Sequence, residues 1–283
     1  MQVIEQQAVK AGVRNRIKAL SFDWTAADIA DPLIYIGADL LDVNLLDLYI
    51  SEYGEPVDGQ NITFVIMPKV NVISSQLGDF GMVTGDWTAD VNLTLIVRPD
   101  ALLAGRGGYG AGHSYYGTPE GDSDTTPSNT GVGYFVFAQQ GRNGLRVTYP
   151  ITVELWGTLA AGGGGGGQTR AGLGGGGGAP FGHRGLAADE AEVISDPELG
   201  ATWLSRDGGR FVGGLGFGAG ADFESAAGNG GDLAAAGGDG YLVGGDDPDE
   251  RGAPAGVAIV ADTGKLNLVI HGDGAVIGDV VYV

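Results

Sequence analysis

The stretch VELWGTLAAGGGG (Val153–Gly165) joins two different kinds of sequence. It begins with an apolar strand pattern, turns at Trp156 and Gly157, continues as a second short apolar strand, and runs directly into six consecutive glycines. Glycine loses more backbone freedom on folding than any other residue and buries no side chain, so such a run is typical of a flexible linker. Whether these glycines are a linker or a structural element decides the fold of the C-terminal half.

The same strand–turn–strand pattern recurs along the chain. Copies are LIVRPDALLAGRGG (Leu95–Gly108), LVIHGDGAVIGDV (Leu268–Val280) and the weaker TFVIMPKVNVISSQ (Thr63–Gln76). Repeated short strands separated by insertions of variable length predict stacked β-coils, each covering the apolar edge of the one before. The glycine-rich region lies between two copies, which favours an insertion folded against its scaffold over a tether between unlike domains.

Glycine is distributed unevenly, with 18 residues in positions 1–156 and 37 in positions 157–283. No strict Gly-X-Y period is present, so a collagen triple helix is excluded. Polyproline-II geometry repeats every three residues and directs its backbone polar groups outward, so parallel glycine rods can bond to one another. The second half therefore predicts a bundle of polyglycine-II rods.

Four glycines are the predicted structural positions of these rods: Gly164, Gly176, Gly213 and Gly216. A side chain on a crowded rod prevents close backbone approach, so we expect Gly164→Val and Gly176→Val to destabilise the fold. Gly252 lies in an acidic segment, and there we expect alanine to be tolerated.

Composition excludes several classes of function. The net charge of −20 argues against nucleic acid and anionic lipid as partners. The absence of cysteine removes disulfides, thiol catalysis and thiolate metal sites. No apolar run is long enough for a signal peptide or a membrane span, so we expect synthesis in a cytoplasm and no membrane insertion.

Three motifs that could indicate a ligand fail on inspection. GRGGYG (Gly105–Gly110) fits a dinucleotide pattern, but the residues that follow are poor helix formers. Gly-Gly-Asp triplets recur every seven residues, whereas calcium-binding β-rolls repeat every nine; their aspartates either terminate rods at exposed turns, which we favour, or bind a hard cation. The histidines are far apart in sequence: His113, His183 and His271. We expect no cofactor, no metal and no catalytic residue.

Several motifs together carry a family resemblance. They are VTGDW (Val83–Trp87), LLAGRGGYG (Leu102–Gly110), LAAGGGGGG (Leu159–Gly167) and the terminal LNLVIHGDGAVIGDVVYV (Leu266–Val283). From about residue 44 onward the chain resembles bacteriophage tail-fibre and tail-tip receptor-recognition adhesins. The resemblance implies a polyglycine-II sandwich whose loops bind host surface receptors.

The predicted fold is mainly β: a β-rich region of stacked strand–turn–strand units, then a polyglycine-II bundle closed by a C-terminal β-element. We expect an attachment region at 1–43, the β-rich domain at 44–160, the glycine bundle with variable loops at 161–265, and the closing β-element at 266–283. Pro32 and Gly37 favour strands in Ile29–Ser51, although its leucines also fit a helix face.

The resemblance implies a virion protein of the phage tail, made in the host cytoplasm, that binds a host polysaccharide or outer-membrane protein and performs no covalent chemistry. Its partners would be other phage tail proteins, and a homotrimer is one assembly we consider. One alternative is a purely structural tail-tip or baseplate protein, and another is a depolymerase of capsule or lipopolysaccharide. Candidate receptor contacts are aromatic and charged residues of the glycine-rich half: Phe181, His183, Arg184, Trp203, Arg206, Asp249 and Arg251.

Overall fold

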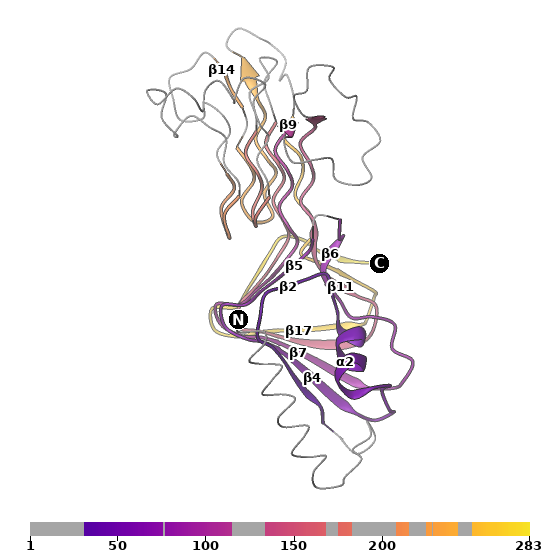
Figure 1. Ribbon diagram of the computed structural model, residues 1–283. Helices are drawn as coiled ribbons and strands as arrows, with labels where there is room; N and C mark the ends of the chain where they lie inside the picture. The colour runs from indigo at the N-terminus through magenta and orange to yellow at the C-terminus, as the bar shows by residue number, and fades with distance from the viewer. Residues whose placement is uncertain are drawn as a thin grey trace.

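Three parallel β-sheets form the sides of a triangular coil in the computed structural model of the chain (Figure 1). Each of the five successive coils contributes one strand to each sheet, and every strand pairs in parallel with its counterpart in the neighbouring coil. The arrangement is a three-sided β-solenoid. The structure describes residues 31–75, 77–114, 134–167, 175–182, 208–214, 225–227, 229–242 and 251–283.

The strands follow one another around the three sheets. The first sheet contains β1 (Leu33–Ile36), β4 (Asn61–Ile66), β7 (Asn92–Val97), β12 (Ile151–Leu155) and β17 (Leu266–Ile270). The second contains β2 (Leu40–Leu41), β5 (Asn71–Ile73), β8 (Leu102–Ala104), β13 (Thr158–Ala160) and β18 (Ala275–Ile277). The third contains β3 (Val43–Asn44), β6 (Phe80–Val83), β11 (Asn143–Val147), β16 (Ile259–Ala261) and β19 (Val280–Tyr282). The four strand–turn–strand units predicted from the sequence are β4–β5, β7–β8, β12–β13 and β17–β18, so the prediction of stacked β-coils is confirmed.

Side chains stack in columns because the strands of adjacent coils pair in register. One inward column of the first sheet consists of Ile34, Phe64, Leu95, Val153 and Leu268. Its first four members are at most 1% exposed. Burying a side chain of this size contributes about 1.5–3 kcal/mol relative to leaving it in water, so these columns are the main source of stability for the solenoid.

The helix α2 (Leu45–Tyr53) connects the first coil to the second. The prediction of strands throughout Ile29–Ser51 is therefore wrong beyond Asn44. The Asn44 side chain accepts hydrogen bonds from the backbone N–H groups of Leu46 and Asp47 and so caps the helix. Gly54, at φ 85°, ends it. In the described part of the chain, no helix has both the length and the apolar character needed to cross a bilayer.

One corner of the triangle carries the glycine-rich sequence. In the third coil residues 105–142 separate β8 from β11, and in the fourth coil residues 161–258 separate β13 from β16. Figure 1 shows that the described parts of both insertions rise side by side from this corner, away from the solenoid. Two antiparallel hairpins lie at the far end: β9 (Gly112–Ser114) with β10 (Tyr134–Val136), and β14 (Ser225–Ala226) with β15 (Tyr241–Leu242).

Candidate functional site

The glycine run 162–167 lies at the centre of the inserted segments. Its N–H groups donate in rotation, at 2.6–2.9 Å, to three neighbours. Gly162 and Gly165 donate to segment 139–142, Gly163 and Gly166 to segment 176–179, and Gly164 and Gly167 to segment 235–238. The carbonyl groups of Gly162–Gly166 accept, with the same period of three, from three other segments, at 253–256, at 108–111 and at Gly231. Every backbone polar group of Gly162–Gly166 is therefore paired.

Close packing leaves no room for side chains on these segments. A β-carbon at Gly164 would overlap the carbonyl group of Ala253, one at Gly176 that of Gly214, and one at Gly213 that of Gly230. Gly216 lies outside the described residues. The expectation that Gly252 tolerates alanine is wrong, because a β-carbon there would overlap the carbonyl group of Gly237.

The two ends of the bundle differ. Near the solenoid the segments reverse in tight turns: the N–H of Gly182 donates to Gly178 at 2.8 Å, that of Gly209 to Val212 at 2.8 Å, and that of Ala235 to Asp232 at 2.9 Å. Ala179 and Leu233 of these turns pack against solenoid residues such as Leu102 and Ala160. At the far end, the chain continues from Gly167, Gly214 and Leu242 into longer connections. Residues 168–174, 215–224 and 243–250 connect segments from the far end, whereas residues 183–207 connect Gly182 to Gly208, whose N–H donates to the Gly182 carbonyl beside the solenoid-side turn.

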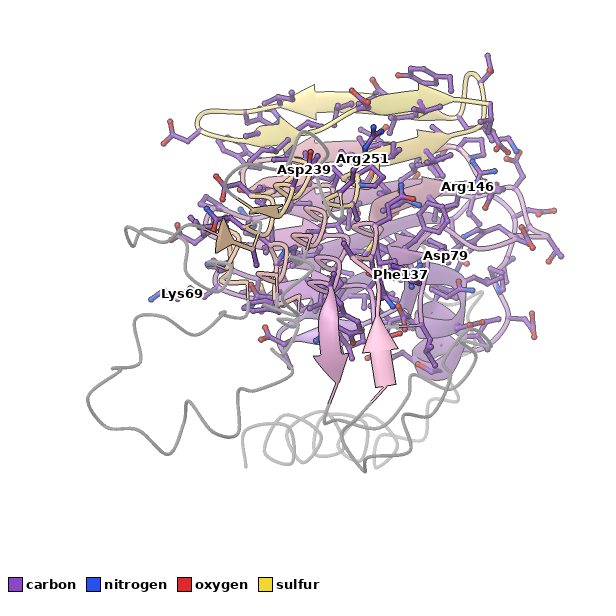
Figure 2. All side chains as sticks on the ribbon, turned by 90° about the horizontal axis from the view of Figure 1, so that it is seen from above. Lys69, Asp79, Phe137, Arg146, Asp239 and Arg251 are labelled. Atoms are coloured by element: carbon purple, nitrogen blue, oxygen red, sulfur yellow. The ribbon has the colours of Figure 1, made fainter. Side chains whose placement is uncertain are left out.

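The structure separates the predicted contact residues that it describes. Phe181 lies in a turn at the solenoid end and packs against the cluster containing Ala179 and Leu233. Arg251 is exposed near the opposite end, where the N–H of the adjacent Gly252 donates to Asp239 Oδ1 at 2.8 Å. Figure 2, which looks down on the molecule from the far end, labels both Arg251 and Asp239. Five predicted contacts lie outside the described residues: His183, Arg184, Trp203, Arg206 and Asp249.

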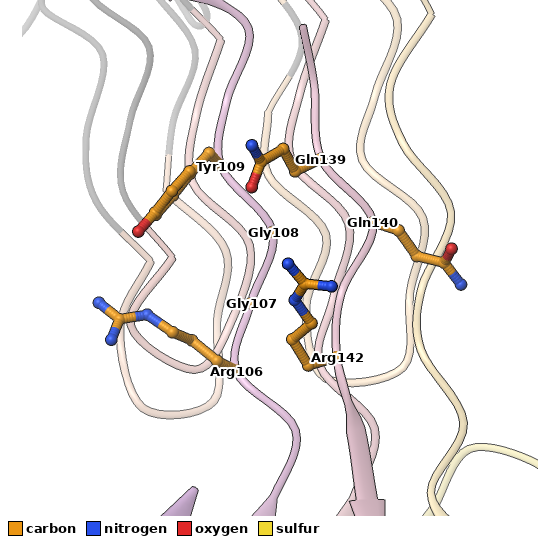
Figure 3. A pocket seen from close by; sticks show the side chains of 7 residues that line it. All are labelled: Arg106, Gly107, Gly108, Tyr109, Gln139, Gln140 and Arg142. Atoms are coloured by element: carbon orange, nitrogen blue, oxygen red, sulfur yellow. The ribbon is translucent and has the colours of Figure 1, made fainter. Parts of the chain in front are cut away.

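A polar cluster that the sequence analysis missed lies on the flank of the bundle. Arg106 and Tyr109 come from one inserted segment, and Gln139 and Arg142 come from its neighbour (Figure 3). The signal in the sequence is the spacing of three within each pair, which a three-residue period places on one edge of a segment. Among the described residues, no group of three or more histidine, aspartate or glutamate side chains is arranged to hold a metal ion.

The described chain is thus a three-sided β-solenoid with hydrogen-bonded glycine-rich segments inserted at one corner. Residues 33–281 match the model of the family described as phage tail fibre adhesin Gp38. The chain therefore belongs to the Gp38 family of phage tail fibre adhesins, and the resemblance identified from the sequence is confirmed. It is a component of the virion, at the tail fibre.

The fold also has a counterpart among solved structures. The crystal structure of the gp37–gp38 adhesin tip complex of the bacteriophage S16 long tail fibre aligns with a TM-score of 0.57. The alignment covers 89% of this chain and 82% of that chain at 21% sequence identity. At this sequence identity the comparison shows a shared fold and nothing more. A comparison with curated proteins gave no match.

Proposed function

We propose that this adhesin binds a host surface receptor through the connections at the far end of its glycine bundle, and that the bundle is a polyglycine-II lattice. The lattice is supported by the three-residue rotation of hydrogen bonds around residues 162–167, since three residues per turn is the period of polyproline-II geometry. Backbone bonds hold such a scaffold together, so its stability does not depend on the side chains of the connections.

The observation that carries the receptor role is the difference between the two ends of the bundle. Turns 178–182, 209–212 and 232–235 lie near the solenoid, whereas residues 115–133, 168–174, 215–224 and 243–250 connect segments from the free end; residues 183–207 are the exception, since they connect Gly182 to Gly208. Arg251, exposed near this end, is the described residue best placed for a contact. His183, Arg184, Trp203, Arg206 and Asp249 remain predicted contacts. We assign Phe181 to packing at the solenoid end because of its apolar neighbours.

We further propose that the chain sits at the tip of a fibre, held by a fibre protein comparable to gp37 in the S16 complex. The N-terminal region, predicted as residues 1–43, would make this attachment. Several copies on one particle would raise the avidity of weak individual contacts through effective concentration. A homotrimer remains one assembly to test by measuring the mass of the purified protein in solution.

Competition for adsorption tests the receptor role. Purified protein should block adsorption of the phage, and a variant in which Asn-Gly replaces residues 115–133 should lose this effect while β9 and β10 stay joined by a hairpin turn. Leu77→Ser, at an exposed solenoid position, is the control that should block as well as the unmodified protein. Blocking that survives the replacement would remove the connection after β9 from the receptor contact.

The alternatives predict different results in the same assay. A purely structural tail-tip protein would not compete for adsorption in any version. A depolymerase would release reducing sugar from host capsule or lipopolysaccharide, which a binding protein does not do.

A further inference from the structure

We propose that the C-terminal end of the solenoid is a self-association surface, which joins two copies of this chain end to end about a two-fold axis. The surface is the outer side of the last coil, formed by β17, β18 and β19. The proposal goes beyond the receptor contact, since it concerns how two adhesin chains are arranged and not what their bundles bind.

The apolar core of the solenoid is exposed at this end and closed at the other. One inward column of the first sheet runs through all five coils and consists of Ile36, Ile66, Val97, Leu155 and Ile270. The exposed fraction of these side chains is at most 3% in the first four coils and 53% at Ile270. An inward column of the third sheet ends in the same way, with Ile259 at 0% and Val280 at 36% exposed. The last coil thus presents a cross-section of the core.

Three strand edges surround the exposed core. The Lys265 carbonyl and the His271 N–H both bond to the fourth coil, each at 2.9 Å. Because successive residues of a strand bond to opposite sides, the backbone groups of Leu266, Leu268 and Ile270 point away from that coil. The strands β17, β18 and β19 are the last of their sheets, and among the described residues no strand pairs with their outer sides. Figure 2 shows this coil, in yellow, as the outermost layer at one end of the solenoid.

These edges lack the features that keep exposed strand edges apart. Such edges are usually protected by charged side chains, by proline or by a β-bulge. The three strands have the sequences LNLVI, AVI and VVY, which contain neither a charged residue nor a proline. An open apolar core and three unprotected strand edges on one face are therefore typical of a surface that another polypeptide covers.

A second copy of the chain presents a matching surface. About a two-fold axis in the plane of the interface, the strand edges of two copies meet antiparallel, and their backbone groups can pair without a particular side chain. A filament, in which the last coil of one chain meets the first coil of the next, is disfavoured because Ile36 of the first coil is 3% exposed and offers no open core. Only one end of the solenoid is open, so the pairing closes at two chains.

Charges at the corners of the face favour the same pairing. Lys265 precedes β17, Asp273 precedes β18 and Asp279 precedes β19, so each corner carries one of them. A two-fold axis through one corner of a triangle exchanges the other two. An axis through either aspartate corner places Lys265 opposite the other aspartate of the second copy. Either arrangement forms two pairs of opposite charge against one pair of like charge. The bundle rises from the side of the solenoid and leaves this end face accessible (Figure 1).

The mass of the full chain in solution tests the proposal. Light scattering after size-exclusion chromatography should give the mass of two 28.7 kDa chains, which falls toward that of one chain on dilution. Ile270→Lys should weaken the association at least about tenfold, because two-fold symmetry places the added charge in the interface twice. Leu41→Lys is the matched control. Leu41 lies in the first coil and is 55% exposed, against 53% for Ile270, and its variant should keep the mass of two chains.

A mass of one chain at every concentration would overturn the proposal and assign the face to a different partner, such as a fibre protein. A mass of three chains would exclude the two-fold pairing. Equal association of Ile270→Lys and Leu41→Lys would place the contact elsewhere and also contradict it. If Ile270→Lys lowers the melting temperature, Val280→Lys repeats the test from another strand of the same face. The measurement needs neither phage nor host, so failure of the receptor contact would leave its result intact and the two proposals fail separately.

Discussion

Replacing Gly164 by valine is the most direct test of the glycine bundle. Gly164 lies in the central run, and its N–H donates to the carbonyl of Ala235 at 2.9 Å. A β-carbon at this position would overlap the carbonyl groups of Ala253 and Pro254, which belong to a neighbouring segment. That segment must move away, because backbone atoms cannot rotate aside as a flexible side chain would.

The cost follows from the bonds that hold the displaced segment. Gly141 N–H donates to Pro254 at 3.1 Å, and Ala253 N–H donates to Gly165 at 2.8 Å. Losing both costs about 1 kcal/mol each, and overpacking adds about 1–3 kcal/mol. The lower entropy of the unfolded valine chain returns less than about 1 kcal/mol. The net loss of about 2–5 kcal/mol corresponds to a fall in melting temperature of roughly 10 °C.

Differential scanning calorimetry of purified Gly164→Val measures this fall, and Gly209→Ala is the matched control. Gly209 belongs to the same bundle, but a β-carbon there meets only the Val212 carbonyl at 3.4 Å, an ordinary contact. We expect its melting temperature to stay within about 2 °C of the unmodified protein. Equal melting temperatures for Gly164→Val and Gly209→Ala would refute the reasoning, because a flexible linker treats both positions alike.

Three further substitutions test the solenoid. Asn44→Ala should lower the free energy of unfolding in urea by about 1 kcal/mol through loss of the cap of α2, and an unchanged denaturation midpoint would contradict that role. Tyr49→Phe removes a 2.9 Å hydrogen bond to Gln60 Oε1 and should cost about 1 kcal/mol in the same measurement; no loss would mean that this buried bond contributes nothing. The hydrogen bond from Lys265 holds the pKa of Asp262 below its ordinary value of 3.8, so its stabilisation is present above about pH 4 and is lost as pH falls through the folded pKa. Asp262→Asn should flatten the decline of melting temperature in that acidic range, and an identical pH profile would exclude the carboxylate as a contributor.

The strand–turn–strand units of the solenoid could be predicted from the sequence because the two strands of each unit are close together in the chain. Each strand–turn–strand unit, such as β7–β8 or β12–β13, lies within about fifteen residues, so its apolar pattern and its turn are visible together. The third strand of the same coils is not local. β11 follows β8 only after residues 105–142, and β16 follows β13 only after residues 161–258, so neither could be assigned to its coil without the pairing. The helix α2 was missed because a short apolar segment fits both the helical period of 3.6 residues and the pattern of a buried strand.

The functional region was predicted less completely than the scaffold. The abundance of glycine and the position of the inserted sequence between two repeats indicated a folded insertion. Both features can be read directly from the sequence. Which segments lie next to one another in the bundle could not be predicted, because a glycine has no side chain that specifies its neighbour. For that reason the prediction that Gly252 tolerates alanine was wrong. The backbone hydrogen bond between Arg142 and Arg106, which joins two segments, could not be predicted from the sequence either.

The rotation of hydrogen bonds around the central glycine run restricts how the bundle can change its length. The N–H group of each residue in the run 162–167 donates to one neighbouring segment, and the N–H group three residues later donates to the same segment. Inserting or deleting one residue would turn every following N–H group toward the wrong neighbour, whereas a change of three residues would restore the phase. Lengthening or shortening of the shaft should therefore occur in triplets, and in all neighbouring segments together, while the connections at the free end can gain or lose any number of residues. Related adhesins should therefore differ by multiples of three residues in the bundle segments and by any number of residues in the connections.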